Sequence, residues 1–145
     1  MDFAHAQAVN DAVRTIAMRH RALAAALLAP LGLHPGQEVI LFDLDAHGPR
    51  TQVQLATASG CEPPTITVSV RRLESAGLVV RRSSPTDGRV TIVELSDRGR
   101  ALMPELRLAW QQLGERTVTH PGQTSPEQLT AVLTDLAAGL RRADG

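Results

Sequence analysis

The sequence predicts a mainly α-helical protein that carries one small β-hairpin. Most segments between proline and glycine breaks place apolar residues at helical spacing. Only residues 78–82 and 90–95 resemble strands, and a polar loop with Asp87-Gly88 at its tip separates them. Two short helices joined by a brief turn come directly before this hairpin.

A long helix is expected over residues 4–30, ended by Pro30 and Gly32. Its apolar residues recur at alternating steps of four and three, with one histidine among them: Val9, Val13, Ile16, His20, Leu23 and Leu27. His34-Pro35 is expected to open a second helix, with the proline in its first turn. Gly48-Pro49 ends that helix.

Residues 51–60 and 63–76 form the predicted helix-turn-helix. The first helix begins with a capping box, Thr51 with Gln54, and closes on Gly60. The second helix opens with Pro63-Pro64 and ends at Gly77.

Two further helices follow the hairpin. Ser96 is expected to cap a helix that runs to about Arg116, with Pro104 kinking or splitting it. Residues 120–126 resemble a linker, and a second capping box at Ser125 opens a helix that ends in Arg141-Arg142. One face of this last helix is apolar: Leu129, Val132, Leu133, Leu136 and Leu140.

The charge distribution favours a polyanionic partner on one face. The chain of 145 residues is neutral overall, with 43% hydrophobic residues. Residues 63–92 nevertheless hold five arginines and two acids, a net charge of +3, which leaves −3 for the remainder. An ordinary charged surface is the alternative for so small an excess.

Cysteine usage and hydropathy indicate a cytoplasmic protein. Cys61 is the single cysteine, so no internal disulfide forms. The sequence shows neither a leader pattern nor an apolar run long enough to span a membrane.

The helix at 63–76 has two contrasting faces. On a helical wheel, Ile66, Val70 and Leu73 form the expected buried stripe. The candidate DNA-binding residues lie opposite or on the flank: Pro64, Thr65, Thr67, Val68, Arg71, Arg72 and Ser75. A short helix with hydroxyls and arginines on its outer face fits the major groove, although an ordinary surface helix would also have this pattern.

The hairpin strengthens the DNA-binding interpretation, because a hairpin directly after a helix-turn-helix makes a winged helix. Arg89 is placed to enter the minor groove, whose negative potential attracts a guanidinium group. Gly88 is expected to supply a positive φ at the turn. Asp87 is interpreted as a brace that pairs with Arg89 or a nearby arginine.

Residues 33–102 resemble the MarR (multiple-antibiotic-resistance regulator) family of bacterial transcription factors. The matching segments are "LHPGQEVILFDL", "TQVQLATASGCEPPTITVSVRRLESAGLVVRR" and "DGRVTIVELSDRGRAL", the last resembling the wing signature D-x-R…L-[ST]-x-x-G. The resemblance implies an obligate homodimer that binds a palindromic site and, less directly, a small-molecule effector that weakens DNA binding. By position in the family's effector cleft, His20, Phe42 and Met103 are the candidate effector residues.

The terminal helices support a dimer independently of the resemblance. Each has an apolar face without an evident partner inside residues 35–100, although packing on each other within one monomer is the alternative. We therefore expect dimerisation segments at 1–34 and 101–145 around a winged helix-turn-helix at 35–100. Two-fold symmetry then places half-sites about 10 base pairs apart.

One position departs from the family pattern. Many relatives carry a basic residue in the middle of the recognition helix, where this chain has Val68. Valine can contact a thymine methyl group but not a phosphate, so we expect a thymine at that position of each half-site.

The predicted function is a double-stranded-DNA-binding transcriptional regulator, a repressor released by an effector. The alternatives are a constitutive regulator without an effector and a winged helix used for protein–protein contact. The scattered histidines (His5, His20, His34, His47 and His120) show no metal-ligand spacing, and we expect no metal, cofactor or enzymatic activity. Cys61 is interpreted as a small packing residue rather than an oxidant sensor.

Overall fold

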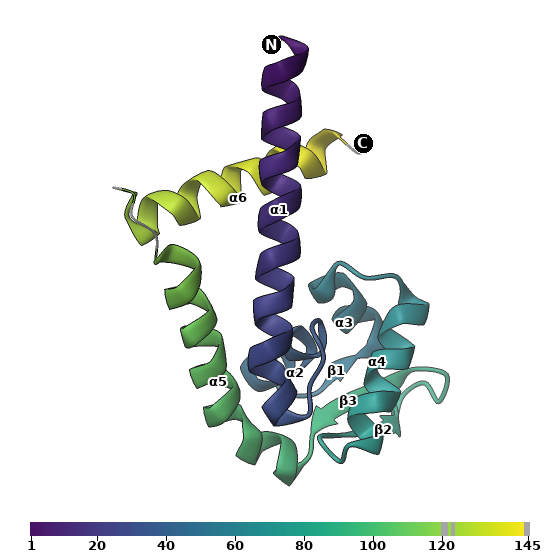
Figure 1. Cartoon of the computed structure of the whole chain (residues 1–145). Coiled ribbons are helices and arrows are strands. Elements are labelled where there is room, and N and C mark those ends of the chain that lie inside the picture. The colour runs from purple at the N-terminus through teal and green to yellow at the C-terminus, as the bar shows by residue number, and fades with distance from the viewer. Residues whose placement is uncertain (120–121, 123, 144–145) are drawn as a thin grey trace. The chain divides into compact units, whose positions relative to one another are not determined.

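The computed structural model describes residues 1–119, 122 and 124–143, except for the side chains of Arg142 and Ala143. The mainly helical fold with a small antiparallel sheet confirms the predicted fold class (Figure 1). Its elements are α1 (Phe3–Leu28), η1 (Ala29–Leu31), α2 (Gln37–His47), β1 (Arg50–Thr51), α3 (Gln52–Ser59), α4 (Pro63–Ser75), β2 (Val79–Ser83), β3 (Thr91–Leu95), α5 (Asp97–Val118) and α6 (Pro126–Ala143). His120 and the linker residues 121 and 123 lie outside the described part. No helix of the described residues is both long enough and apolar enough to cross a membrane.

The chain divides into two compact units, Met1–Trp110 and Gln111–Gly145. The core of the first unit brings α2, α3 and α4 together with the sheet. It consists mainly of aliphatic side chains, among them Leu28, Ile40, Leu41, Leu44, Leu55, Ile66, Val70, Leu73, Val79, Val93 and Leu106. In the second unit, Ser125 and Gln128 form the predicted capping box of α6, because each side chain accepts a hydrogen bond from the other's backbone N–H.

The sheet has one strand more than predicted. Its order is β1-β3-β2, with Arg50 and Arg81 flanking Val93 from the two sides. β1 is only Arg50–Thr51, which is too short to show a strand periodicity in the sequence. It pairs with β3 and so attaches the start of the helix-turn-helix to the hairpin.

The prediction for Pro35 was wrong, and one of the two alternatives for Pro104 is excluded. Pro35 does not lie in the first turn of α2: the helix begins at Gln37 after Gly36, whose φ of 101° requires glycine. The Gln37 and Glu38 side chains accept hydrogen bonds from the His34 and Gly36 amides and stabilise this turn. Pro104 lies inside α5 without splitting it. The predicted Gly48 and Gly60 helix ends are confirmed.

The hairpin is attached to α5 by a tight junction. Ser96 Oγ accepts from Gly99 N at 3.0 Å, as predicted for a cap, and donates to the Gly77 carbonyl at 2.5 Å. Ser96 N donates to the Leu78 carbonyl at 3.0 Å. A Cβ at Gly99 would overlap that same carbonyl oxygen, so only glycine allows α5 to approach so closely. The Ser-x-x-Gly of the wing signature therefore fixes the end of α4 and the start of β2 against α5.

Candidate nucleic-acid interface

Helix α4 presents the two faces that its sequence predicts. Ile66, Val70 and Leu73 are buried, with 2%, 0% and 1% of their surface exposed, which confirms the stripe. On the other side, six of the candidate DNA-binding residues are exposed: Pro64, Thr65, Val68, Arg71, Arg72 and Ser75. Val68 keeps 49% of its surface accessible.

Thr67 differs from the other candidates on α4. It is half-buried, and its hydroxyl donates to the Pro63 carbonyl at 3.1 Å. The same oxygen accepts a hydrogen bond from Gln52 Nε2 of α3 at 3.2 Å. Thr67 therefore joins the two helices of the helix-turn-helix, and its hydroxyl is already engaged. Sequence reasoning missed Gln52, which lies 15 residues away along the chain.

The loop between β2 and β3 carries an exposed arginine held by an aspartate. Asp87 Oδ1 accepts from Arg89 N at 3.1 Å and from Arg89 Nε at 3.2 Å. This confirms the interpretation of Asp87 as a brace. The Arg89 side chain is 93% exposed. Gly88 is also exposed, but its predicted positive φ was wrong. The seven residues 84–90 are long enough to reverse the chain without a left-handed residue, and the Asp87 side chain fixes the turn instead.

The arginines at the base of the hairpin have a different role from Arg89. Arg81 forms a two-pronged ion pair with Glu74, with Nε–Oε2 and Nη2–Oε1 distances of 2.9 and 3.1 Å. This hydrogen-bonded pairing lowers the pKa of Glu74 and raises the pKa of Arg81. Arg82 Nε lies 3.8 Å from Oε1 of Glu94 on the neighbouring strand β3. Arg81 thus ties β2 to the end of α4, and both arginines have acidic partners inside the domain.

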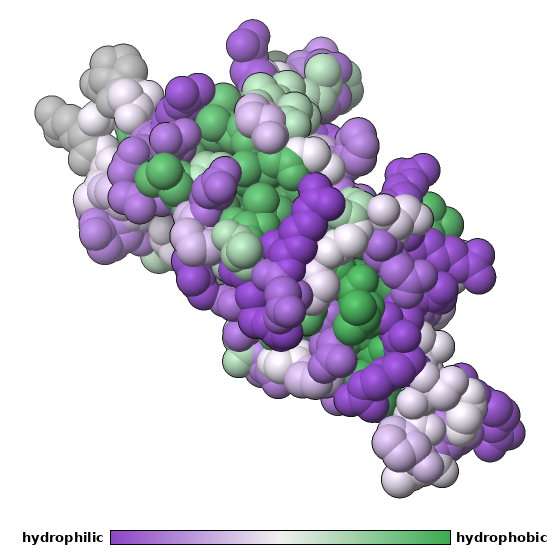
Figure 2. All heavy atoms as spheres, turned by 90° about the horizontal axis from the view of Figure 1, so that it is seen from below, coloured by the Kyte–Doolittle hydropathy of each residue, from purple (hydrophilic) through white to green (hydrophobic). Residues whose placement is uncertain are grey.

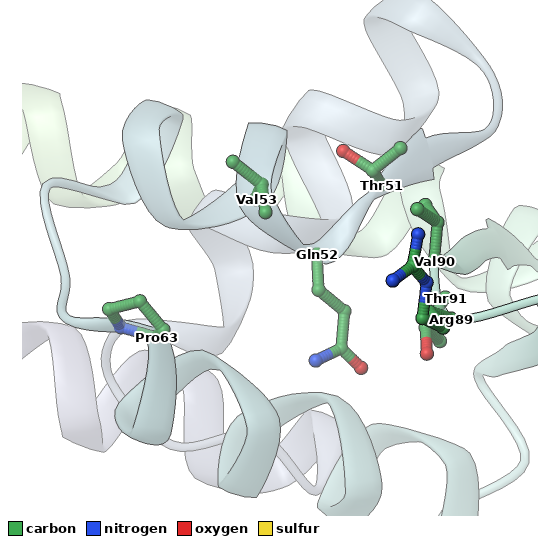
Figure 3. A pocket seen from close by; sticks show the side chains of 7 residues that line it. All are labelled: Thr51, Gln52, Val53, Pro63, Arg89, Val90 and Thr91. Carbon is green, nitrogen blue, oxygen red and sulfur yellow. The ribbon is translucent and has the colours of Figure 1, made fainter. Parts of the chain in front are cut away.

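A cavity of about 240 Å³ lies where α3, α4 and the hairpin loop meet (Figure 3). Gln52 extends from the start of α3 toward α4, while Arg89 approaches from the hairpin. Pro63, Val53 and Thr91 complete much of the lining. The space between the helix-turn-helix and the wing is therefore hollow, and Gln52 and Arg89 contribute polar groups to a lining that also contains apolar side chains.

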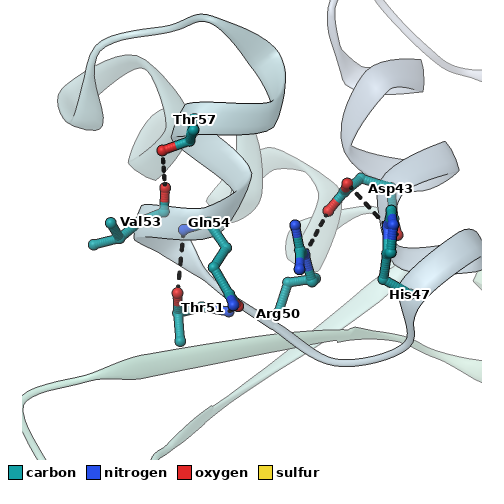
Figure 4. Close-up of polar contacts among 7 residues, drawn as sticks. All are labelled: Asp43, His47, Arg50, Thr51, Val53, Gln54 and Thr57. Atoms are coloured by element: carbon teal, nitrogen blue, oxygen red, sulfur yellow. Dashed lines mark hydrogen bonds and ion pairs between the residues drawn. The ribbon is translucent and has the colours of Figure 1, made fainter.

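A polar network positions the start of α3 beside the hairpin (Figure 4). Asp43 of α2 accepts from Arg50 Nε at 2.9 Å and lies 3.2 Å from His47 Nδ1. Thr51 and Gln54 form the predicted capping box. Thr51 N donates to Gln54 Oε1 at 2.9 Å, and Gln54 N donates to Thr51 Oγ1 at 3.1 Å. These contacts hold β1 and the first turn of α3 in place.

The three candidate effector residues do not lie around one described cavity. His20 is exposed on α1, and Met103 is buried in the core at 2% exposure. Phe42 packs its ring against Trp110, with the centroids 5.9 Å apart. The packing role proposed for Cys61 was also wrong, because this residue is exposed and its thiol donates only to the Ser59 carbonyl at 3.5 Å.

A helix-turn-helix followed by a sheet with an exposed basic loop defines the winged-helix class of DNA-binding proteins. The MarR family profile matches residues 33–91. The HTH-type transcriptional repressor NicR of Pseudomonas putida is 33% identical over 107 residues, which are 74% of this chain and 68% of NicR. The chain belongs to the MarR family.

Two solved structures are similar to nearly the whole chain. A probable transcriptional regulator from Pseudomonas aeruginosa is 31% identical with a TM-score of 0.80, covering 88% of this chain and 96% of that one. BpsR of Bordetella bronchiseptica, in a structure concerning regulation of its DNA binding by 6-hydroxynicotinic acid, is 25% identical with a TM-score of 0.77. That alignment covers 90% of this chain and 96% of BpsR. The chain is a DNA-binding transcriptional regulator, and the comparisons confirm that it is not an enzyme.

Proposed function

We propose that this regulator is a repressor that binds palindromic duplex DNA as a homodimer and is released by a small organic acid. The observation that carries the DNA-binding proposal is the exposed polar face of α4 next to the exposed Arg89 of the wing. Helix and wing are tied together by the Glu74–Arg81 ion pair. A rigid pair of this kind suits simultaneous contact with two adjacent grooves.

In the proposed complex, α4 enters the major groove. Pro64, Thr65, Val68, Arg71, Arg72 and Ser75 face the DNA there, and Thr67 positions the helix through Gln52. Val68 contacts a thymine methyl group. Asp87 and Gly88 shape the wing tip, from which Arg89 reaches the minor groove.

The homodimer is supported by apolar surface on both terminal helices. On α1, Val9, Val13 and Ile16 are 45%, 50% and 55% exposed. On α6, Val132, Leu136 and Leu140 are 55%, 54% and 66% exposed. Figure 2 shows apolar surface, in green, open between polar side chains. Covering these side chains with a second copy would remove them from water, so we assign segments 1–34 and 101–145 to dimerisation around a winged helix-turn-helix at 35–100.

The effector proposal rests on the family and on BpsR, whose DNA binding is regulated by 6-hydroxynicotinic acid. BpsR and this chain share 25% of aligned residues, so a related acid is a reasonable class of ligand. His20, Phe42 and Met103 stay the predicted effector residues, although no described cavity brings the three together. The cytoplasmic location stays a prediction.

Footprinting on DNA that flanks the protein's own gene tests the proposal, followed by anisotropy titrations of the protected duplex at several salt concentrations. Three exposed arginines per copy, Arg71, Arg72 and Arg89, give up to six phosphate contacts in a dimer. The log–log slope of affinity against salt should therefore approach about −5. Light scattering measures the oligomeric state. A monomer without affinity for duplex DNA in dilute buffer would refute the proposal, and in that case the protein–protein module becomes the better interpretation.

A further inference from the structure

A side-chain hydrogen bond joins the two helices of the helix-turn-helix. Gln52 at the start of α3 donates from Nε2 to Thr67 Oγ1 of α4 at 3.2 Å, and both residues are half-buried. The Thr67 hydroxyl donates its own hydrogen to the Pro63 carbonyl at 3.1 Å. Because that hydrogen is engaged, the Thr67 oxygen can serve only as an acceptor for Gln52. The direction of the contact is therefore fixed, and Gln52 must present its amide NH₂ group to α4.

Gln52 reaches α4 across a hollow part of the domain (Figure 3). It lines the cavity of about 240 Å³, together with Pro63 in the first turn of α4 and Arg89 of the wing. Side chains do not fill this space, so van der Waals contacts across it contribute little to holding the helix. The hydrogen bond to Thr67 is thus the contact that spaces the start of α3 from the first turns of α4 on this side.

Core packing alone does not determine the orientation of α4. Its buried stripe fixes which face points inward, but apolar contacts are non-directional. Directional polar contacts hold the helix at two separate points. The Glu74–Arg81 ion pair attaches its C-terminal end to β2, and the hydrogen bond from Gln52 holds its N-terminal half at Thr67. A helix held at only one of these points can still pivot about it.

The N-terminal contact also connects α4 to the wing. Gln52 directly follows β1 (Arg50–Thr51), and β1 pairs with β3 of the hairpin. The ion pair of Arg50 with Asp43 holds β1 from the other side, against α2. These contacts resist any movement of Gln52 relative to β3. Gln52 therefore transmits the position of the sheet to Thr67.

We propose that Gln52 is a positioning residue for DNA recognition, because through Thr67 it fixes the N-terminal half of α4 relative to the wing. Pro64, Thr65 and Val68 are exposed in this half of the helix, and in the proposed complex they face the bases. Gln52 needs no contact with a base for this role. The inference rests on the proposed function, in which α4 lies in the major groove and the wing in the minor groove.

Gln52 then controls sequence discrimination rather than attraction to phosphates. A gap of about 0.5–1 Å already removes about a quarter to a half of a van der Waals contact. The short, stiff side chain of Val68 cannot close such a gap. The long side chains of Arg71 and Arg72 can follow a phosphate when the helix shifts, because they have several rotatable bonds. A pivot of α4 therefore weakens base contacts more than phosphate contacts.

Four variants of the full chain separate these effects. Gln52→Met keeps the length of the side chain but removes the donor, and Thr67→Val keeps the shape but removes the hydroxyl. Thr67→Ser keeps the hydroxyl. Thr57→Val is the matched control: the Thr57 hydroxyl donates to the Val53 carbonyl of its own helix at 3.1 Å, and among the described residues it has no partner on another helix. Thermal melts check that each variant is folded.

Anisotropy titrations compare the duplex protected in footprinting with a shuffled duplex of the same composition. Gln52→Met and Thr67→Val should each lower the ratio of the two affinities about two- to tenfold, as expected for the loss of one hydrogen bond. The double variant should lose no more than either single variant, because both changes remove the same contact. Thr67→Ser and Thr57→Val should keep the wild-type ratio. All variants should keep the wild-type dependence on salt, since the arginines are unchanged.

A merely destabilised fold would weaken binding of both duplexes together and leave their ratio unchanged. An unchanged ratio in Gln52→Met overturns the positioning role. Losses that multiply in the double variant also overturn it, because the two residues then act separately. So does a Thr67→Ser variant that behaves like Thr67→Val, since the hydroxyl is then not the group that matters.

Amide hydrogen exchange without DNA separates this inference from the proposed function. Gln52→Met should speed exchange in the N-terminal half of α4 about two- to tenfold, while the C-terminal half keeps its wild-type rate. If this pattern appears but the wild type does not distinguish the two duplexes, Gln52 holds α4, whereas the proposed function and the role of Gln52 in discrimination are refuted. If the wild type distinguishes the duplexes but Gln52→Met leaves exchange unchanged, the positioning role is overturned and the proposed function stands.

Discussion

The junction between the wing and α5 leaves no room for a side chain at Gly99. A Cβ there would overlap the Leu78 carbonyl oxygen, and it would lie 3.1 Å from the carbonyl carbon and 3.3 Å from Leu95 Cδ2. The Leu78 carbonyl oxygen belongs to the backbone, and it already accepts a hydrogen bond from Ser96 N at 3.0 Å. Gly99→Ala must therefore push α5 away from the turn that follows the recognition helix.

The expected cost follows from three contributions. Inserting a methyl group where nothing can yield costs about 1–3 kcal/mol, and losing the Ser96–Leu78 hydrogen bond costs about 1 kcal/mol more. Alanine in place of glycine within a helix recovers at most about 1 kcal/mol. We expect a net loss of about 1–4 kcal/mol in the free energy of unfolding. For a chain of this size that corresponds to a fall in Tm of roughly 3–16 °C.

Thermal and urea unfolding at matched protein concentration measure this loss, because the stability of a dimer depends on concentration. Gly114→Ala in the same helix is the control: nothing lies within 4 Å of a Cβ built there. That variant should be as stable as the wild type or up to about 1 kcal/mol more stable. If Gly99→Ala unfolds at the same temperature as Gly114→Ala, the steric account of the junction is refuted.

Three further predictions concern the recognition helix α4 and the wing. Arg89→Ala should lose about 1–3 kcal/mol in the free energy of DNA binding, measured by anisotropy. Light scattering should show an unchanged oligomeric state. If the variant and the wild type bind DNA with equal affinity, the wing does not contribute to DNA binding. Val68→Arg should change the preferred base at one position of each half-site in a selection experiment, and an unchanged preference would eliminate the thymine contact. Glu74→Gln should loosen the wing. Because Arg81 lowers the pKa of Glu74 in the folded state, their pairing stabilises the protein above the ordinary pKa of glutamate, and that stabilisation is lost as pH falls through the lowered pKa. Wild-type Tm should therefore fall over this acidic range more steeply than that of Glu74→Gln, and parallel Tm–pH curves would contradict the assignment.

Local and periodic features of the fold were predictable from the sequence. Ile66, Val70 and Leu73 recur at the spacing of one helical face, and all three are buried. The capping box of Thr51 with Gln54 and the cap of Ser96 depend on residues three positions apart. Such signals lie within one turn of chain, so they do not depend on the tertiary structure.

Features that depend on a distant partner were not predictable. β1 exists because Arg50–Thr51 meets β3, and two residues carry no periodicity of their own. The Gln52–Thr67 hydrogen bond requires the particular packing of α3 on α4. Pro35 was misplaced because proline is common both in a first helical turn and in the turn before a helix, and here the left-handed Gly36 selects the second.

Some arginines of this region are paired with acidic residues, whereas Arg89 keeps groups available for DNA. This difference explains how a neutral chain can bind a polyanion. Glu74 and Glu94 engage Arg81 and Arg82, so these two arginines brace the wing instead of adding to its positive surface. Asp87 acts differently, because it binds Arg89 only through the backbone N–H and Nε. Both Nη groups of Arg89 have no partner among the described residues and remain available to a phosphate or a base edge. An acid at the wing tip would repel DNA if it stood alone. Bound to Nε, it instead restricts the arginine before DNA arrives, which lowers the conformational entropy lost on binding. The acidic residues of this region therefore support DNA binding by fixing the basic ones, and net charge alone underestimates the capacity of the surface to bind DNA.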